Sequence, residues 1–88
     1  VLVLQGPIAG VTRLGWSPGG AVIASGYRDG RVRLWDLASG RELRLLEGHS
    51  DQVASLCWLA VGDQLVSGSI DGTIKIWHAL TGRLERVM

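Results

Sequence analysis

The sequence predicts an all-β fold built from two similar antiparallel units of four strands each. The first observation is an internal repeat: residues 1–46 align with residues 43–88 without a gap, and 14 of the 46 aligned pairs are identical. The second is that each copy holds four short segments, mostly rich in branched or aromatic residues, separated by glycine-bearing turns. The third is that no segment combines helical periodicity with capping residues.

The expected strands follow one another at short intervals. They are residues 11–16, 21–26, 31–36 and 41–46 in the first copy, and residues 53–58, 64–69, 73–78 and 83–88 in the second. Pairs that end in glycine separate the later strands of each copy, at 29–30, 39–40, 71–72 and 81–82. Glycine adopts positive φ without a steric penalty, so these pairs predict tight turns.

The apolar residues predict which strands lie inside. The stretch VASLCWLAV, which begins at Val53, has no polar face and predicts a strand packed between two neighbouring sheets. Cys57 lies in this stretch, so we expect a small buried residue rather than a reactive thiol. As the single cysteine it excludes an internal disulfide. The strand from Arg41 alternates charged residues with leucines, which predicts an outer, partly solvated strand.

Charge argues against several classes of partner. The net charge is +1 and no run of 18 apolar residues occurs, so we expect neither nucleic-acid nor membrane binding. The charge is uneven, however, because residues 1–46 carry a net +3 and residues 47–88 a net −2. Four arginines could form a basic patch: Arg13, Arg28, Arg31 and Arg33. The tryptophans are not interleaved with them for base stacking, which favours a solvated or protein-facing surface.

A period of this length with four short strands per copy is typical of β-propeller blades. The ordered motifs resemble two consecutive WD40 repeats, and the resemblance covers essentially the whole chain. The first repeat carries Trp16-Ser17-Pro18, Ser25-Gly26, Asp29-Gly30 and Trp35-Asp36. The second carries Gly48-His49, Val53, Trp58, Ser67-Gly68, Asp71-Gly72 and Trp77, with His78 where the family usually has aspartate.

The resemblance implies a particular phasing of repeats and blades. Each repeat of the family begins with the outer strand of one blade and continues with the three inner strands of the next. Residues 1–46 are then the first repeat, with an outer strand at 1–5 and inner strands from Val11, and residues 47–88 are the second. We therefore expect two whole blades plus one extra outer strand, nine strands in all, within a larger or an oligomeric propeller.

Serine, histidine and aspartate residues in the second repeat invite a catalytic interpretation. The chain lacks a nucleophile elbow such as G-x-S-x-G, and the resemblance implies instead a buried structural tetrad of His49, Ser67, Asp71 and Trp77. The first repeat keeps three of these positions, Ser25, Asp29 and Trp35, but has Pro7 in place of the histidine. We expect that its tetrad does not close and that the first blade is softer.

No catalytic residue, metal site or cofactor is expected. His49, His78 and Cys57 lack the paired spacing of metal ligands, and the glycines are not followed by the residues of a phosphate-binding loop. The single cysteine and the resemblance favour an intracellular setting, cytoplasmic or nuclear.

The expected function is a non-catalytic scaffold that presents loops to partner proteins or peptides. The candidate contact loops hold Ile8, Ala9, Gly10, Arg28, Ser50, Asp51, Gln52 and Ile70. Among them, Ile70 is an apolar residue on a turn and a candidate anchor. Two alternatives stay open. One is a structural blade pair that completes a ring by self-association or with other blades, in cis or in trans; the other is a regulatory propeller of a larger multidomain protein.

Overall fold

The computed structural model describes residues 10–60 and 63–88, and these residues form strands and turns without a helix. The eight strands are β1 (Val11–Trp16), β2 (Val22–Tyr27), β3 (Val32–Asp36), β4 (Glu42–Leu46), β5 (Val53–Trp58), β6 (Gln64–Ser69), β7 (Ile74–His78) and β8 (Arg83–Val87). Every strand predicted in residues 11–88 is confirmed, with ends that differ by at most one residue. The extra outer strand expected at residues 1–5 lies outside the described residues.

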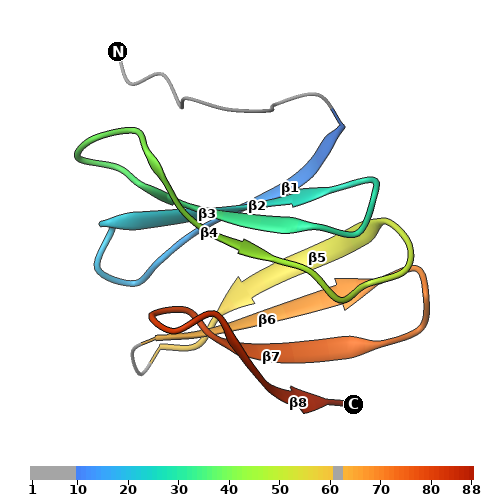
Figure 1. Ribbon diagram of the computed structural model, residues 1–88. Helices are drawn as coiled ribbons and strands as arrows, with labels where there is room; N and C mark the ends of the chain where they lie inside the picture. The colour runs from blue at the N-terminus through green and yellow to red at the C-terminus, as the bar shows by residue number, and fades with distance from the viewer. Residues whose placement is uncertain (1–9, 61–62) are drawn as a thin grey trace.

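The strands form two separate antiparallel sheets, each a simple meander (Figure 1). The first sheet has the order β1-β2-β3-β4 and the second β5-β6-β7-β8. The predicted glycine turns join the strands: Gly30 and Gly72 have φ of 91°, and each donates its N–H to the residue three positions earlier at 3.1 Å. Local turn chemistry therefore fixes the strand pairing within each sheet.

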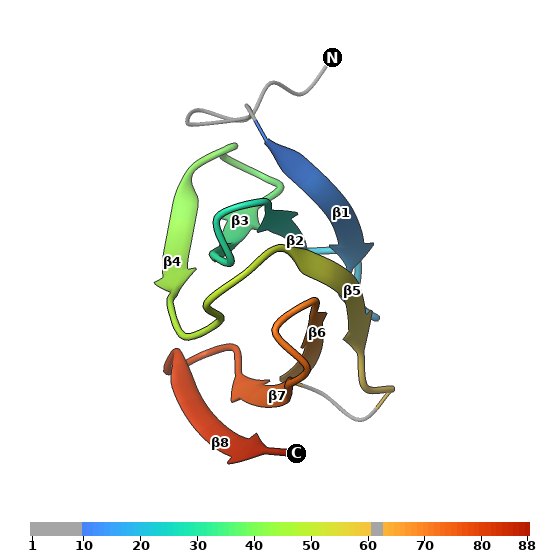
Figure 2. The same cartoon turned by 90° about the vertical axis from the view of Figure 1, so that its right-hand side faces the viewer.

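The two sheets stack face to face, with their equivalent strands in line (Figure 2). The innermost strand of the second sheet, β5, packs against β1 and β2 of the first sheet. The approach is close at Gly26 in β2, where an added Cβ would meet Cγ1 of Val53 at 2.6 Å. A glycine at this position is therefore needed for the sheets to stack at this spacing.

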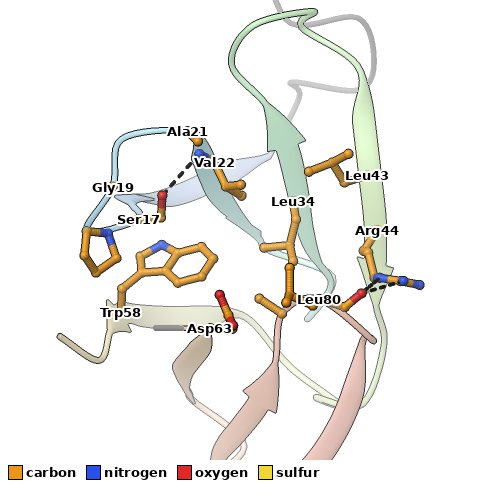
Figure 3. A pocket seen from close by; sticks show the side chains of 12 residues that line it. Ser17, Gly19, Ala21, Val22, Leu34, Leu43, Arg44, Trp58, Asp63 and Leu80 are labelled. Atoms are coloured by element: carbon orange, nitrogen blue, oxygen red, sulfur yellow. Dashed lines mark hydrogen bonds between the residues drawn. The ribbon is translucent and has the colours of Figure 1, made fainter. Parts of the chain in front are cut away.

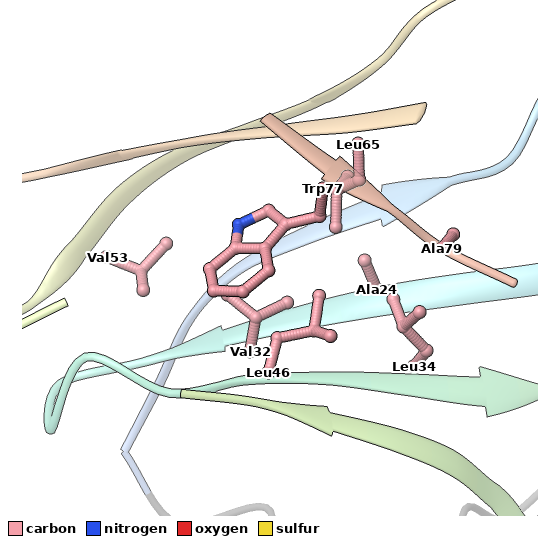
Figure 4. Close-up of a cluster of buried hydrophobic side chains, with 8 residues drawn as sticks. All are labelled: Ala24, Val32, Leu34, Leu46, Val53, Leu65, Trp77 and Ala79. Carbon is pink, nitrogen blue, oxygen red and sulfur yellow. The ribbon is translucent and has the colours of Figure 1, made fainter. Parts of the chain in front are cut away.

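The shared core lies between the two sheets (Figure 4). The indole ring of Trp77 lies over Val32 and Leu46 of the first sheet. The other buried members of this cluster are Ala24, Leu34, Val53, Leu65 and Ala79. The core is formed by the side chains of each sheet that point toward the other sheet. Because side chains alternate along a strand, those on the outer face of each sheet lie outside this core.

The expected burial of Cys57 is wrong, because its side chain is exposed. Its neighbours Leu56 and Trp58 pack against the core shared with the first sheet, so Cys57 between them points to the opposite face. The apolar stretch from Val53 is thus covered on one side only within the described residues. The expectation of partly solvated outer strands is confirmed, since most of β4 and all of β8 are exposed.

Candidate functional site: a buried hydrogen-bond chain and the loop end above it

Four residues of the second sheet lie in one chain of hydrogen bonds. The indole N–H of Trp77, on β7, donates to Oγ of Ser67, on β6, at 2.8 Å. The same oxygen lies 2.7 Å from Nε2 of His49, in the link between β4 and β5. On the other side of the ring, Nδ1 of His49 lies 3.4 Å from Oδ2 of Asp71, in the β6–β7 turn. The structure therefore brings together all four residues of the expected tetrad.

The donors and acceptors along these hydrogen bonds show which ring nitrogen of His49 carries the proton. A tryptophan indole only donates, so Ser67 accepts from Trp77 and gives its single hydroxyl proton to Nε2 of His49. The imidazole is then neutral with its proton on Nδ1, where it faces Asp71. Burial lowers the pKa of His49 below its ordinary value of 6.5, although the nearby Asp71 carboxylate acts in the opposite direction. Both arguments give an uncharged histidine.

Asp71 is held in place by its own turn and by the preceding link. Its carboxylate accepts hydrogen bonds from the hydroxyl and the main-chain N–H of Thr73 and from the main-chain N–H of Ser50. These bonds, that of the Thr73 hydroxyl foremost, keep the pKa of Asp71 well below its usual range. Thr73 also lies 3.1 Å from Nδ1 of His49. Comparison of the two repeats does not point to Thr73, because its counterpart in the first repeat is Arg31.

Burial decides what this chain of residues can do. The side chain of His49 is fully buried, and Ser67 is 0% exposed. A substrate therefore has no access to the serine hydroxyl or to the imidazole. These hydrogen bonds instead join two inner strands to the link before β5 and to the β6–β7 turn, so they hold the loops at one end of the sheet in place.

The first sheet satisfies its corresponding serine in a different way. Trp35 donates to Oγ of Ser25 at 2.8 Å, as in the second sheet, but here that oxygen lies 3.1 Å from the hydroxyl of Tyr27 and 3.5 Å from the main-chain oxygen of Arg33. Asp29 takes no part, because it accepts from the main-chain N–H of Arg31 and pairs with the guanidinium of that residue. Tyr27 lies two residues after Ser25 and hence on the same face of β2, and this spacing could have identified it.

The candidate contact loops meet at one end of the two sheets. The turn residue Ile70 is 60% exposed, and its N–H donates to the main-chain oxygen of Gln52 at 3.0 Å. Next to Gln52, the main-chain oxygen of Asp51 lies so close to Gly30 that an added Cβ would meet it at 2.8 Å. The exposed Arg28 lies in that same turn of the first sheet. Ile8 and Ala9, also expected here, lie outside the described residues.

The four arginines do not form one free basic patch. Arg31 pairs with Glu47 at 3.2 Å, in addition to its contact with Asp29. Arg33 pairs with Glu42 at 2.6 Å, and its guanidinium lies over the ring of Tyr27. Two of the four charges are thus matched by carboxylates.

A cavity of about 480 Å³ opens between the sheets at the end opposite the contact loops (Figure 3). Leu34 lies on its inner side and Trp58 along one wall. The exposed Leu80 lies at its edge, where Arg44 donates two hydrogen bonds to the main-chain oxygen of that residue. Sequence reasoning missed this cavity because its walls come from both repeats, and the distance between the sheets is not encoded in either repeat alone.

The described part of the chain offers no cluster of three or more histidine, cysteine or acidic residues that could hold a metal. Nor does it contain a helix long and apolar enough to cross a membrane.

Comparison with known proteins identifies the family. Residues 4–58 match the family model "Anaphase-promoting complex subunit 4 WD40 domain", and residues 40–78 match the model "WD domain, G-beta repeat". Mitochondrial division protein 1 of Eremothecium gossypii is 67% identical over 33 residues, which is 38% of this chain and 5% of that protein. The probable serine/threonine-protein kinase PkwA of Thermomonospora curvata is 53% identical over 38 residues, which is 43% of this chain and 5% of that protein.

Solved structures give the same answer over nearly the whole chain. The β-propeller domain of Cps50 (Swd1) from Myceliophteria thermophila matches with a TM-score of 0.88 and 30% identity, covering 96% of this chain and 26% of that one. U3-55K matches with a TM-score of 0.89 and 27% identity, covering 97% of this chain and 28% of that one. This chain therefore spans about a quarter of the solved propellers. It belongs to the WD40-repeat family, and its two sheets are two blades of a β-propeller.

Proposed function

We propose that this chain is a non-catalytic scaffold that binds partner proteins or peptides through the loop end of its two blades. The observation that carries the proposal is the position of Ile70. This apolar side chain is 60% exposed, yet its loop is held by a main-chain bond to Gln52 and by the hydrogen bonds of the adjacent Asp71. An exposed apolar group on a fixed loop loses little conformational entropy on binding, and this suits it as an anchor.

The neighbours of Ile70 supply polar contacts around this anchor. Asp51 is exposed and negative, whereas Arg28 is exposed and positive, on the turn of the other blade. Such a surface, with an apolar centre and charges of both signs, suits a protein or peptide better than the uniformly negative backbone of a nucleic acid. Proteins of the family serve generally as interaction scaffolds, and this supports the assignment at the level of class.

A regulatory propeller attached to a catalytic domain is the second candidate. It is favoured by one observation: 38 residues of this chain match part of a protein named as a probable serine/threonine-protein kinase. The proposal for this chain is compatible with that arrangement, because the blades themselves would still act by binding.

The test is selection of binders from a phage-displayed library of random 12-residue peptides on the folded chain. Enriched peptides are expected to lose binding to an Ile70→Asp variant. They are expected to retain binding to Leu80→Asp, since Leu80 is similarly exposed, at 63%, but lies at the opposite end. If the enriched peptides bind the Ile70→Asp variant as well as the unchanged chain, the loop end is not the binding surface.

A further inference from the structure

The cavity at the end opposite the contact loops reaches the core that the two blades share (Figure 3). Two of its lining residues, Leu34 and Ala79, are buried members of that core, and Trp58 packs against it. Leu43 and Leu80 also line the cavity and are exposed, at 51% and 63%. The cavity is therefore an apolar hollow that opens to solvent. Its volume of about 480 Å³ lies within the range of about 300–1,000 Å³ that is typical of ligand sites.

Hydrogen bonds hold the walls of this cavity in place. In the β1–β2 turn, the N–H of Ser17 donates to the main-chain oxygen of Val22 at 2.8 Å, and the N–H of Val22 donates to the hydroxyl of Ser17 at 3.1 Å. On the second blade, the N–H of Ala79 donates to the main-chain oxygen of Asp63 at 2.6 Å. The indole of Trp58 is fixed by its bond to the main chain of the first blade. Because the walls are already ordered, a ligand loses little binding free energy in ordering them.

Two side chains of opposite charge line the cavity without a charged partner. Arg44, on the first blade, donates from Nε and Nη2 to the main-chain oxygen of Leu80, and its remaining N–H groups have no partner among the described residues. The carboxylate of Asp63, on the second blade, likewise makes no hydrogen bond or ion pair within the described ranges 10–60 and 63–88. Figure 3 shows Leu80 between these two charges. An apolar hollow with free groups of both signs suits a ligand that carries complementary charges on either side of an apolar group.

We propose that this cavity binds the C-terminal residue of a partner protein, with its apolar side chain against Leu34 and Trp58 and its terminal carboxylate on Arg44. The N–H groups that Arg44 has free include one on Nη1 and one on Nη2, and such a pair holds a carboxylate through two parallel hydrogen bonds. The main-chain oxygen of Leu80 fixes the orientation of the guanidinium. In a C-terminal residue the carboxylate and the apolar side chain leave the same Cα, so one residue reaches both the hollow and the guanidinium at its edge.

Asp63 determines what precedes the terminal residue. It lies beside Trp58 and on the other side of Leu80 from Arg44 (Figure 3). A lysine or arginine a few positions before the C-terminus therefore pairs with Asp63, whereas an acidic residue at that position is repelled. A fatty acid also offers an apolar body and a carboxylate, but it leaves Asp63 without a partner. The class of partner is thus a protein that ends in an apolar residue with a basic residue shortly before it.

The experiment titrates the folded chain with the peptide acetyl-Lys-Ser-Gly-Leu as the free acid and follows the NMR signals of Trp58 and Leu34. We expect shifts that saturate, together with cross-peaks between the leucine methyl groups of the peptide and the ring protons of Trp58. The same peptide with a C-terminal amide is expected to bind roughly ten- to a hundredfold more weakly, because it lacks the charged acceptor for Arg44.

Variants of the cavity residues locate the ligand. Leu80→Asp places a negative charge at the mouth of the cavity and is expected to weaken binding of the free acid at least about tenfold. Arg44→Lys keeps the charge but not the pair of parallel donors, so it is expected to weaken binding of the acid about two- to tenfold and to leave the amide unchanged. Asp63→Asn is expected to weaken binding about two- to fivefold, but only for peptides that contain the lysine.

The matched control is Leu14→Asp, because Leu14 is 58% exposed on β1 and does not line the cavity. Its binding of the free acid is expected to be unchanged. Four results would overturn the proposal: no saturable shift of Trp58 or Leu34, equal binding of acid and amide, undiminished binding to Leu80→Asp, and octanoate bound as tightly as the peptide.

This site does not rest on the proposed function of the loop end. Peptides displayed on phage are joined to the coat protein at their C-terminus, so the selection at the loop end samples no free terminal carboxylate. Success or failure of the peptide titration is therefore independent of whether Ile70 anchors a partner.

Discussion

Trp58 donates its indole N–H to the main-chain oxygen of Gly15, 43 residues earlier in the chain, at 2.9 Å. This bond joins β5 of the second blade to β1 of the first, and the ring beside it packs on the apolar core that both blades share. The two blades are thus connected by a specific polar contact as well as by apolar packing.

Replacement of Trp58 by phenylalanine removes the bond to Gly15 and keeps a large aromatic ring. We expect the free energy of unfolding to fall by about 1 kcal/mol, the net value of one hydrogen bond, as measured by urea denaturation. Trp16→Phe is the matched control, because Trp16 is the same residue type at the equivalent position but is exposed. At concentrations where the chain is monomeric, an equal loss from both substitutions would contradict the account.

Replacement of Gly26 by alanine tests the close approach of the blades. The added Cβ would meet Cγ1 of Val53 at 2.6 Å, so one blade must move, and we expect a destabilisation of about 1–3 kcal/mol. Gly19→Ala is the control, since nothing lies within 4 Å of its Cβ position and its φ is not in the left-handed region. Urea denaturation of the control should show unchanged or slightly increased stability.

Removal of the serine hydroxyl in each blade tests the two hydrogen-bond chains. Ser67→Ala leaves the buried indole N–H of Trp77 and Nε2 of His49 without their partner, and we expect a loss of about 2–4 kcal/mol in the free energy of unfolding. Tyr27→Phe removes the hydroxyl that satisfies Ser25, and we expect a loss of about 1 kcal/mol. A Tyr27→Phe variant as stable as the unchanged chain would show that Tyr27 does not substitute for the missing histidine.

Stability is expected to fall as the pH is lowered from 8 to 5. The pKa of His49 is lower in the folded chain than its ordinary value of 6.5, so the unfolded chain binds the proton more readily. The contribution of His49 to the free energy of unfolding is therefore fully present above about pH 6.5. It decreases as the pH falls through that value toward the pKa of His49 in the folded chain. The pKa of Asp71 is also lowered on folding, so its contribution is lost only in stronger acid.

The pH dependence is measured as the urea midpoint at each pH. A His49→Gln variant is expected to be less stable at pH 8 and to lose most of the slope between pH 7 and pH 5. His78→Gln is the matched control, because His78 lies at the other end of the second blade and its side chain bonds, within the described residues, only to the exposed Thr81. A slope that disappears in the His78 variant and persists in the His49 variant would contradict the assignment.

The strands, the turns and the second tetrad could be predicted from the sequence because the repeat aligns the residues that determine them. Asp71-Gly72 fixes a turn by local backbone chemistry, and Ser67 and Trp77 follow at the same spacing as Ser25 and Trp35. These features depend on residues close together in the chain or equivalent between the repeats, and such patterns are visible in one sequence.

The features that could not be predicted depend on which face of a strand meets another sheet. Cys57 lies in an apolar stretch, but the side chains of a strand alternate, and the sequence does not state which side is covered. Tyr27 differs from these features, because its spacing from Ser25 places both side chains on one face of β2. Alignment of the repeats conceals its role, since its counterpart Ser69 bonds to the main-chain oxygen of Asp51. The cavity beside Trp58 required the distance between two blades, which no single repeat contains.

The measurement that tests the account most directly is hydrogen exchange of the four indole N–H groups, followed by NMR at a concentration where the chain is monomeric. The indoles of Trp35, Trp77 and Trp58 are each hydrogen-bonded, whereas the described residues offer Trp16 no such partner. We predict three slowly exchanging indole protons and one that exchanges at once. Fast exchange of Trp58 together with Trp16 would show that the two blades do not pack as described, and would contradict the account.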